Sequence, residues 1–319
     1  MESNRFAREF NLEVPIVQGP MGGVAGPELV AAVASAGGLG VLPIWTMTPA
    51  QIQRAVAETK RLTAGNFAVN VRADLHQFDH VSAAIESGVS VIHLFWGDPS
   101  PYAKVIREAN ARMVCTVWDE ASAAIAVDAG AQALIAQGVE AGGHVLSELP
   151  LRDLLDRVLP IAGGIPVVAA GGLATAEDVR DAVGAGASGA LLGTRFVATL
   201  ESIAHDEYKA ALIEAGPDAT ARSECFEIDW PDAPHRHLRN DTYMAWQAAG
   251  RPEPGSRPGE GDVILKMGDA EIPRYSVVPP RRGMRGQIRD AVLYAGTGVH
   301  RITNIPGAAA VVRDLASLL

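Results

Sequence analysis

Between Val14 and Leu192, short apolar segments alternate with longer amphipathic ones, and this alternation constrains the fold more than any other feature. The apolar segments have the length of buried strands, whereas Ala, Leu and Val recur at helical spacing in the longer segments. We predict strands at 14–18, 39–42, 67–71, 89–94, 112–117, 133–137, 166–169 and 189–192. We predict helices between them at 27–36, 48–62, 78–86, 101–109, 120–129, 149–161 and 175–185.

Repeated strand–helix units build a parallel sheet that is buried on both faces. Eight strand candidates favour an α/β fold of the closed (β/α)8 TIM-barrel type over an open, doubly wound sheet. A glycine just past the end of a helix caps it cheaply in the left-handed conformation. Such small residue–glycine pairs precede predicted strands at Ala36-Gly37, Ser87-Gly88, Ala129-Gly130 and Ala185-Gly186. We therefore predict a ligand-binding barrel over residues 1–200.

Residues 201–319 do not continue the regular alternation of apolar and amphipathic segments. We predict helices near 205–215, 239–249, 285–295 and 306–318, with a Pro/Gly-rich segment at 251–261. Little of this part alternates in a way that builds its own sheet. We therefore expect a partly helical C-terminal extension that completes the barrel and caps one end, with an independent second domain as the alternative.

The composition excludes several classes of function. A formal net charge of −10 argues against a nucleic-acid surface and against anionic membranes. The N-terminus lacks an apolar signal core and no apolar run could span a bilayer, so we expect a soluble, cytoplasmic protein. Cys115 and Cys225 form no disulfide framework and no zinc pattern, and we expect Cys115 to be a small buried hydrophobic residue.

The loop after the sixth predicted strand is the sharpest candidate site, because barrel ligands bind at the C-terminal ends of the strands. This loop reads Gln137-Gly-Val-Glu-Ala-Gly-Gly-His144. Gly142 and Gly143 let a flat or anionic ligand approach the main chain, and His144 can exchange protons near neutral pH. We expect His144 to be catalytic and Glu140 to make a structural hydrogen bond.

The loops after the seventh and eighth strands favour a phosphate group. Helix N-termini at these two positions commonly present free N–H groups to an anion in such barrels. The candidate residues are Gly171, Gly172, Gly193 and Thr194. Ordinary glycine-rich turns are the alternative, and Arg195 would either add charge or form a structural salt bridge.

No dinucleotide-binding fingerprint or P-loop occurs, so the motifs disfavour a stably bound pyridine nucleotide or nucleoside triphosphate. His235 and His237 flank Arg236, and we expect them in a solvated loop. No carboxylate or cysteine stands near them at ligand spacing, so we predict no metal site. The remaining histidines have no local context that raises them above a structural role: His76, His80, His93, His205 and His300.

With these residues in place, the chain resembles the nitronate monooxygenase family, once called 2-nitropropane dioxygenases. These are FMN-dependent barrels that also include enoyl-acyl carrier protein reductase II enzymes and certain NAD(P)H:quinone reductases. The resemblance runs from Pro15 to about Thr199 and resumes at 293–298. Its motifs are Gln137–His144, Gln18-Gly-Pro-Met-Gly22, Ala36-Gly-Gly-Leu-Gly40, Ala170-Gly-Gly172 and Gly193-Thr-Arg-Phe196.

The resemblance implies an FMN site and assigns its residues. Met21 and Gly22 would pack against the flavin ring, Asn70 and Gln137 would hydrogen-bond it, and Gly142 and Gly143 would approach it. Gly171, Gly172, Gly193 and Thr194 would hold the phosphate. The family's catalytic histidine corresponds to His144. The chain departs from the family on the fifth strand, where relatives place a polar or basic side chain near the flavin and this chain has Cys115-Thr116-Val117. We expect Thr116 to bind the cofactor there.

The activity that the resemblance implies is the oxidation of alkyl nitronates or nitroalkanes by O2 to a carbonyl compound and nitrite. The alternative within the family is NAD(P)H-dependent reduction of a quinone or an enoyl thioester. A flavin-free barrel isomerase or lyase acting on a sugar phosphate is the alternative from another class. A homodimer is compatible with the sequence, which leaves open the physiological substrate and the roles of residues 220–284, Thr297 and His300.

Overall fold

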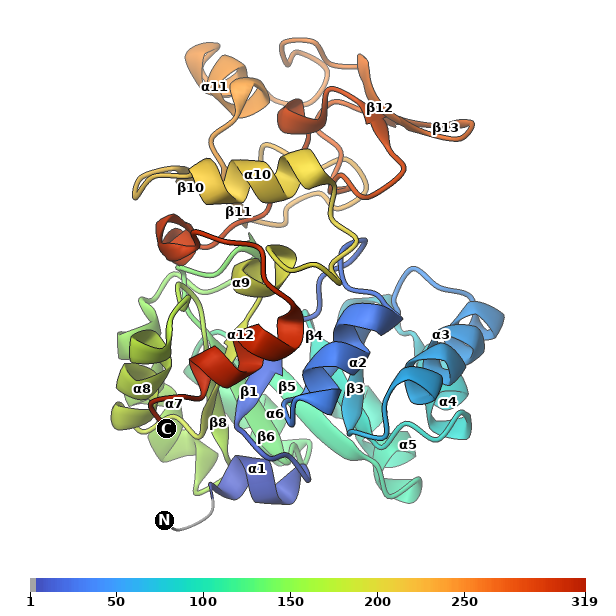
Figure 1. Cartoon of the computed structure of the whole chain (residues 1–319), viewed down its shortest axis with the longest axis vertical. Coiled ribbons are helices and arrows are strands. Elements are labelled where there is room, and N and C mark those ends of the chain that lie inside the picture. Colours follow the sequence, from blue (N-terminus) through green and yellow to red (C-terminus); the bar gives the residue numbers. More distant parts are fainter. Residues whose placement is uncertain (1–3) are drawn as a thin grey trace.

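The computed structural model describes residues 4–319 and places a barrel below a smaller cap (Figure 1). Eight parallel strands form one sheet in the order β1-β9-β8-β6-β5-β4-β3-β2. A bridge between Val17 and Leu39 joins the two end strands, so that the barrel is nearly closed and the predicted fold is confirmed. The strands are β1 (Ile16–Gln18), β2 (Gly40–Pro43), β3 (Phe67–Arg72), β4 (Val91–Phe95), β5 (Arg112–Val117), β6 (Ala133–Gln137), β8 (Val167–Ala170) and β9 (Gly189–Leu192).

Local capping signals define the helices that surround these strands. Thr48, Asp119 and Thr175 each begin a helix with a capping box, in which side chain and main chain satisfy each other's free groups. A short helix, α1 (Arg5–Glu9), precedes the barrel. The barrel helices are α2 (Pro27–Ser35), α3 (Pro49–Leu62), α4 (Phe78–Glu86), α5 (Ala103–Glu108), α6 (Glu120–Asp128), α7 (Leu151–Ala162) and α8 (Ala176–Gly184).

Each barrel strand alternates between an outer apolar layer and the barrel interior, as the pleat of a strand requires. On β4, Ile92 and Leu94 pack with the helices, whereas Val91 joins the interior cluster. Towards the C-terminal end of the strands, three neighbouring strands place polar side chains at buried positions: Asn70 on β3, His93 on β4 and Thr116 on β5. The interior therefore changes from apolar to polar where barrel ligands bind.

The cap is built mainly from residues after β9. It contains α9 (Thr194–Val197), α10 (Asp206–Glu214) and α11 (Asp241–Ala248), whereas α12 (Ala308–Leu315) returns to the barrel and packs against α2 and α8 (Figure 1). Two small antiparallel sheets lie among these helices. One has the order β10-β11-β7 and the other β13-β12-β14. Their strands are β7 (Gly143–His144), β10 (Thr220–Ser223), β11 (His235–Leu238), β12 (Val263–Met267), β13 (Ala270–Pro273) and β14 (Arg285–Gly286).

Two expectations for the cap were wrong. The segment was not expected to form sheets, yet it forms two, because its strands are too short to show a clear alternation. No α-helix covers 285–295 either: β14 is followed only by a 3-10 turn, Ile288–Asp290. Gly286 has φ +126 and lies so close to β12 that a side chain there would clash with the Ile264 carbonyl group. This contact favours an edge strand over a helix.

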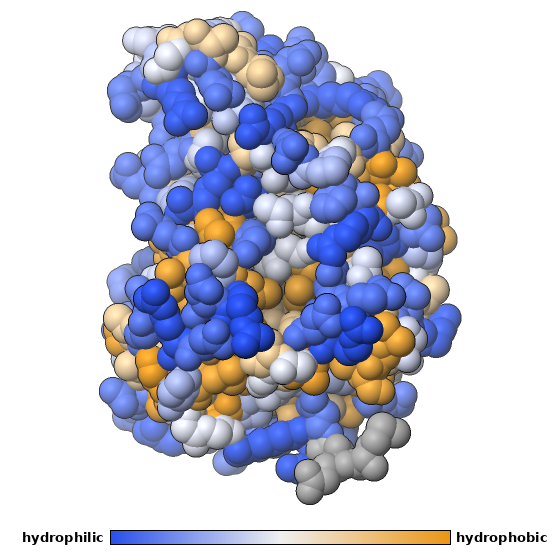
Figure 2. Space-filling model, turned by 90° about the vertical axis from the view of Figure 1, so that its left-hand side faces the viewer, coloured by the Kyte–Doolittle hydropathy of each residue, from blue (hydrophilic) through white to orange (hydrophobic). Residues whose placement is uncertain are grey.

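On the face of the molecule shown in Figure 2, hydrophilic residues predominate and hydrophobic residues form separate groups between them. In the part of the chain that the structure describes, no helix combines the length and apolarity that crossing a bilayer requires.

Replacement of Gly40 by Ala tests the packing of α2 against β2. A methyl group at Gly40 would lie 2.4 Å from the Val30 carbonyl oxygen and 2.8 Å from its Cα, both main-chain atoms that cannot move aside locally. We expect G40A to lower the free energy of unfolding in urea by about 1–3 kcal/mol. The control G184A meets no atom within 4 Å at a helical position, and it should raise stability by up to about 1 kcal/mol. Equal effects of the two substitutions would contradict this packing.

Candidate active site

A cavity of about 410 Å³ lies at the C-terminal end of the barrel, where loops from the barrel and the cap meet. All twelve residues proposed from the sequence line this cavity. They are Met21, Gly22, Asn70, Thr116, Gln137, Gly142, Gly143, His144, Gly171, Gly172, Gly193 and Thr194. The structure thus brings together loops that are far apart in the sequence, while the individual roles of these residues stay predictions.

The loops after β8 and β9 form one side of the cavity. Gly171 and Gly172 have φ angles of +126 and +69, a conformation that glycine adopts without strain. The Thr194 hydroxyl accepts a hydrogen bond of 3.0 Å from the Gly296 N–H. Arg195 points away from this side, since its guanidinium donates to the main-chain oxygens of Asn304 and Ala198. Arg195 therefore holds the chain before α12, rather than supplying charge to the cavity.

The segment 293–298 is anchored to the His144 loop. The Thr297 N–H donates to the Glu140 carbonyl oxygen at 3.0 Å, and Thr297 lies beside Gly172. The Glu140 carboxylate accepts a hydrogen bond from the Leu151 N–H at the start of α7, which agrees with the expected structural role. His300 is exposed. This segment therefore shapes the cavity mainly through its main chain, with Gly296 and Gly298 among the lining residues.

His144 is held by the cap as well as by the barrel. It lies on β7, which pairs in antiparallel register with β11, so that His144 stands opposite His235. The Gln137 amide donates to the His144 carbonyl oxygen at 3.3 Å. The Nε2 atom of His144 is buried and has no hydrogen-bond partner among the described residues. The barrel loop alone therefore does not position this side chain.

Aromatic and cationic groups surround the His144 ring. Trp230 stacks on it with 3.8 Å between ring centroids, and Arg72 lies 3.2 Å from the centroid of the Trp230 ring. Burial lowers the pKa of His144 well below 6.5, and His235 and the Arg72 charge lower it further. The imidazole is therefore neutral at pH 7. Stacking covers a face of the ring, whereas Nε2 lies in the ring plane and has no hydrogen-bond partner among the described residues.

The prediction that His235 and His237 lie in a solvated loop was wrong. Both are fully buried on β11, where the first and third positions of His-Arg-His-Leu face the interior of the cap. The His235 ring donates to Ala233 and accepts from the Phe226 N–H, and His237 contacts Ser223 and Leu238. Burial lowers the pKa of His235 to about 4 and that of His237 to about 3. Both therefore serve as neutral hydrogen-bonding residues.

Several lining residues were not identified from the sequence. His93, for which the sequence indicates no more than a structural role, is 2% exposed and lines the cavity. The period-two pattern Val91-Ile-His-Leu-Phe95 could have revealed it, because His93 occupies an inward position like Val91. No local signal could have revealed the lining residues from other loops: Trp45, Trp230, Val277, Val278, Arg281 and Tyr294.

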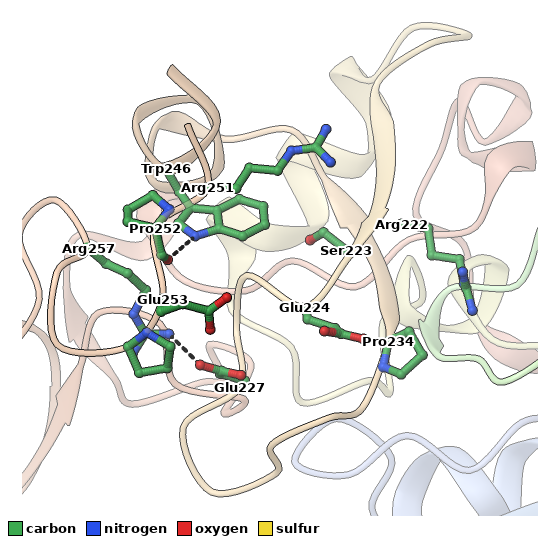
Figure 3. Close-up of a pocket in the computed structure, with 11 residues that line it drawn as sticks. Arg222, Ser223, Glu224, Glu227, Pro234, Trp246, Arg251, Pro252, Glu253 and Arg257 are labelled. Atoms are coloured by element: carbon green, nitrogen blue, oxygen red, sulfur yellow. Dashed lines mark hydrogen bonds and ion pairs between the residues drawn. The ribbon is translucent and has the colours of Figure 1, made fainter. Parts of the chain in front are cut away.

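A second pocket, of about 270 Å³, lies within the cap between β10 and the Pro-rich segment (Figure 3). Its arginines are matched by glutamates: Arg257 pairs with Glu227 at 3.1 Å, and Glu224 and Glu253 also line the pocket. This balance gives no preference for an anion. Within residues 4–319, no three His, Cys, Asp or Glu side chains are grouped so as to hold a metal ion.

A model of the family described as nitronate monooxygenase matches residues 4–317. The chain belongs to the nitronate monooxygenase family. It is an oxidoreductase with a TIM-barrel fold, and this membership sets aside the isomerase or lyase alternative.

The relatives that resemble this chain in sequence are named for different activities. The chain is 37% identical over 247 residues to the (3aS,4S,5R,7aS)-5-hydroxy-7a-methyl-1-oxo-octahydro-1H-indene-4-carboxyl-CoA dehydrogenase of Mycobacterium tuberculosis, covering 76% of this chain and 68% of that enzyme. It is 28% identical to the nitronate monooxygenase of Pseudomonas aeruginosa, with 96% of each chain covered. The family is therefore clear, whereas the substrate differs among relatives.

Solved structures that resemble this chain also belong to enzymes with different names. FabK from Thermotoga maritima superimposes with a TM-score of 0.82 and 27% identity, covering 100% of this chain and 96% of FabK. The nitroalkane oxidase of Streptomyces ansochromogenes superimposes with a TM-score of 0.78 and 28% identity, covering 98% and 97% of the two chains. The cap as well as the barrel is thus shared with both.

The buried histidines predict a loss of stability in acid. His93, His235 and His237 have folded-state pKa values of about 3, 4 and 3, below the ordinary value of 6.5. As pH falls below 6.5, these histidines become protonated in the unfolded chain but stay neutral in the folded protein. Each histidine should therefore lower the free energy of unfolding by about 1.4 kcal/mol per pH unit.

Urea unfolding between pH 7 and pH 5 measures this effect. H237Q removes one histidine, so its stability should fall less with pH than that of the unsubstituted protein, by about 2 kcal/mol over the whole interval. Identical pH dependence of the two proteins would contradict the neutral, buried state of His237.

Proposed function

We propose that this protein uses FMN to oxidise alkyl nitronates or nitroalkanes with O2, forming a carbonyl compound and nitrite. The observation that carries the proposal is the neutral, unpartnered Nε2 of His144 on the wall of the cavity. A group of this kind can remove a proton from an acidic carbon. The relatives named nitronate monooxygenase and nitroalkane oxidase support the same substrate class.

The lining residues fit FMN. The Asn70 Oδ1 atom is buried without a partner on the cavity wall, where the polar edge of a flavin would satisfy it. A side chain at Gly143 would meet no protein atom within 4 Å, so that the main chain there borders open space. Gly171, Gly172, Gly193 and Thr194 would hold the phosphate at the opposite loops. FMN, when bound, would supply the transfer of electrons from the substrate to oxygen.

The chain's own contribution is to position the substrate and to move one proton. His144 Nε2 would take the α-proton of a neutral nitroalkane and so generate the nitronate. The Trp230 ring would hold the imidazole plane in place, because it covers that ring at stacking distance. The overall reaction balances when two nitroalkanes and one O2 yield two carbonyl compounds and two molecules of nitrous acid.

Replacement of His144 tests its role as base. We expect H144A and H144N to bind FMN but to turn over neutral nitroalkanes about 10²- to 10⁴-fold more slowly, the usual contribution of a general base. A preformed nitronate bypasses proton removal and should react at a rate much closer to that of the unsubstituted protein. Nitrite release with both substrate forms measures the difference. Unchanged turnover of the neutral nitroalkane would remove His144 from this role.

The second candidate is oxidation or reduction of an acyl thioester. The observation that favours it is the 37% identity to a dehydrogenase whose name specifies a CoA thioester. A neutral His144 could equally remove a proton next to a thioester carbonyl group. Reduction would instead need a His144 that is protonated before the reaction, whereas the lowered pKa of His144 leaves it neutral at that point.

Anaerobic mixing separates these activities. If nitronate oxidation is the function, a nitronate should bleach the bound flavin quickly, whereas NADH and NADPH should bleach it slowly or not at all. An acyl-CoA that bleaches the flavin would favour the dehydrogenase activity. Fast bleaching by NADH or NADPH would contradict the nitronate proposal and favour a reductase. Stopped-flow absorbance of the FMN-loaded protein gives all of these rates.

A further inference from the structure

His93 is a polar side chain that the proton-transfer chemistry does not use. It lies on β4, is 2% exposed, and its Nε2 atom is 2.7 Å from the Thr116 hydroxyl oxygen on β5. Its other ring nitrogen, Nδ1, is buried and has no partner among the described residues. His93 and Thr116 are both among the residues that line the cavity, so this unpaired atom belongs to a side chain that borders it.

A second unpaired atom stands on the neighbouring strand. Asn70 is the register partner of His93, and its amide N–H donates to the His93 carbonyl oxygen at 3.0 Å. This bond fixes the amide so that Oδ1 is left buried and unpaired. Buried polar atoms normally have partners, and leaving one without a partner costs free energy. Two such atoms on adjacent strands therefore indicate a place built for a polar ligand edge.

We propose that His93, oriented by Thr116, donates a hydrogen bond from Nδ1–H to a carbonyl oxygen on the pyrimidine edge of the flavin. The inference rests on the proposed use of FMN. That edge presents an N–H between two carbonyl oxygens. Asn70 Oδ1 can only accept, so it suits the ring N–H, and an adjacent donor then suits a neighbouring carbonyl oxygen. His93 becomes that donor when the Thr116 hydroxyl donates to Nε2.

Two variants test the pair. H93F keeps an aromatic ring, although a larger one, and removes both nitrogens, whereas T116V keeps the size of the side chain and removes the hydroxyl that selects the tautomer. Loss of one buried hydrogen bond should raise the FMN dissociation constant of H93F about 10- to 100-fold and that of T116V by a smaller factor. A donor at a flavin carbonyl stabilises the reduced, more electron-rich ring. The midpoint potential of bound FMN should therefore become more negative in both variants.

The control is C115A. Cys115 is buried on the opposite face of β5, next to Thr116, and does not line the cavity. C115A should keep the affinity and potential of the unsubstituted protein. The melting temperature of the FMN-free protein should fall to a similar, small extent in H93F and T116V, because both remove the buried hydrogen bond between His93 and Thr116.

Each result decides a different point. If the unsubstituted apoprotein binds FMN but H93F binds it equally well with an unchanged potential, this inference alone is wrong. A lower melting temperature of FMN-free H93F together with an unchanged potential would assign His93 a structural role instead. If H93F does not fold, T116V carries the test through the same two measurements. Failure of the unsubstituted protein to bind FMN would overturn the proposed function, and this inference with it.

Discussion

Closure of the parallel strands into a barrel is the constraint on which the site depends. In a closed barrel every second side chain points inward, and the interior is too narrow to admit water along its length. The lower interior is therefore apolar, with residues such as Val91 and Val114. Polar side chains can point inward without a large desolvation penalty only near the C-terminal ends of the strands, where a cavity opens. Asn70, His93 and Thr116 lie at this level on three consecutive strands.

The cap contributes a second constraint, because it determines the state of His144. Pairing of β7 with β11 places His144 against a buried histidine, and Trp230 covers its ring. Burial then keeps the imidazole neutral. A loop on the barrel alone would leave His144 in solvent with an ordinary pKa. The position of the proposed base and its protonation state therefore come from different parts of the chain.

This arrangement also explains how one family accommodates different substrates. The proposed cofactor side of the cavity is formed by glycine-rich barrel loops, whereas Trp230, Val277 and Arg281 come from the cap segment 220–284. Under the proposed function, a barrel with the same histidine would meet different substrates when the cap changes. The similarity to both a nitroalkane oxidase and a CoA-thioester dehydrogenase is consistent with this division.

The sequence by itself determined the eight strands, the barrel helices, and the strand ends and loops that carry the twelve candidate residues. These features depend on local signals: apolar runs, helical spacing, capping residues and glycines at strand ends. The tertiary structure alone decided the burial of His235 and His237 and the stacking of Trp230 on His144. These contacts join residues far apart in the chain, such as His144 and His235, and no local pattern encodes such a pairing. The protonation state of His144 follows from them, because desolvation depends on what surrounds a side chain in space.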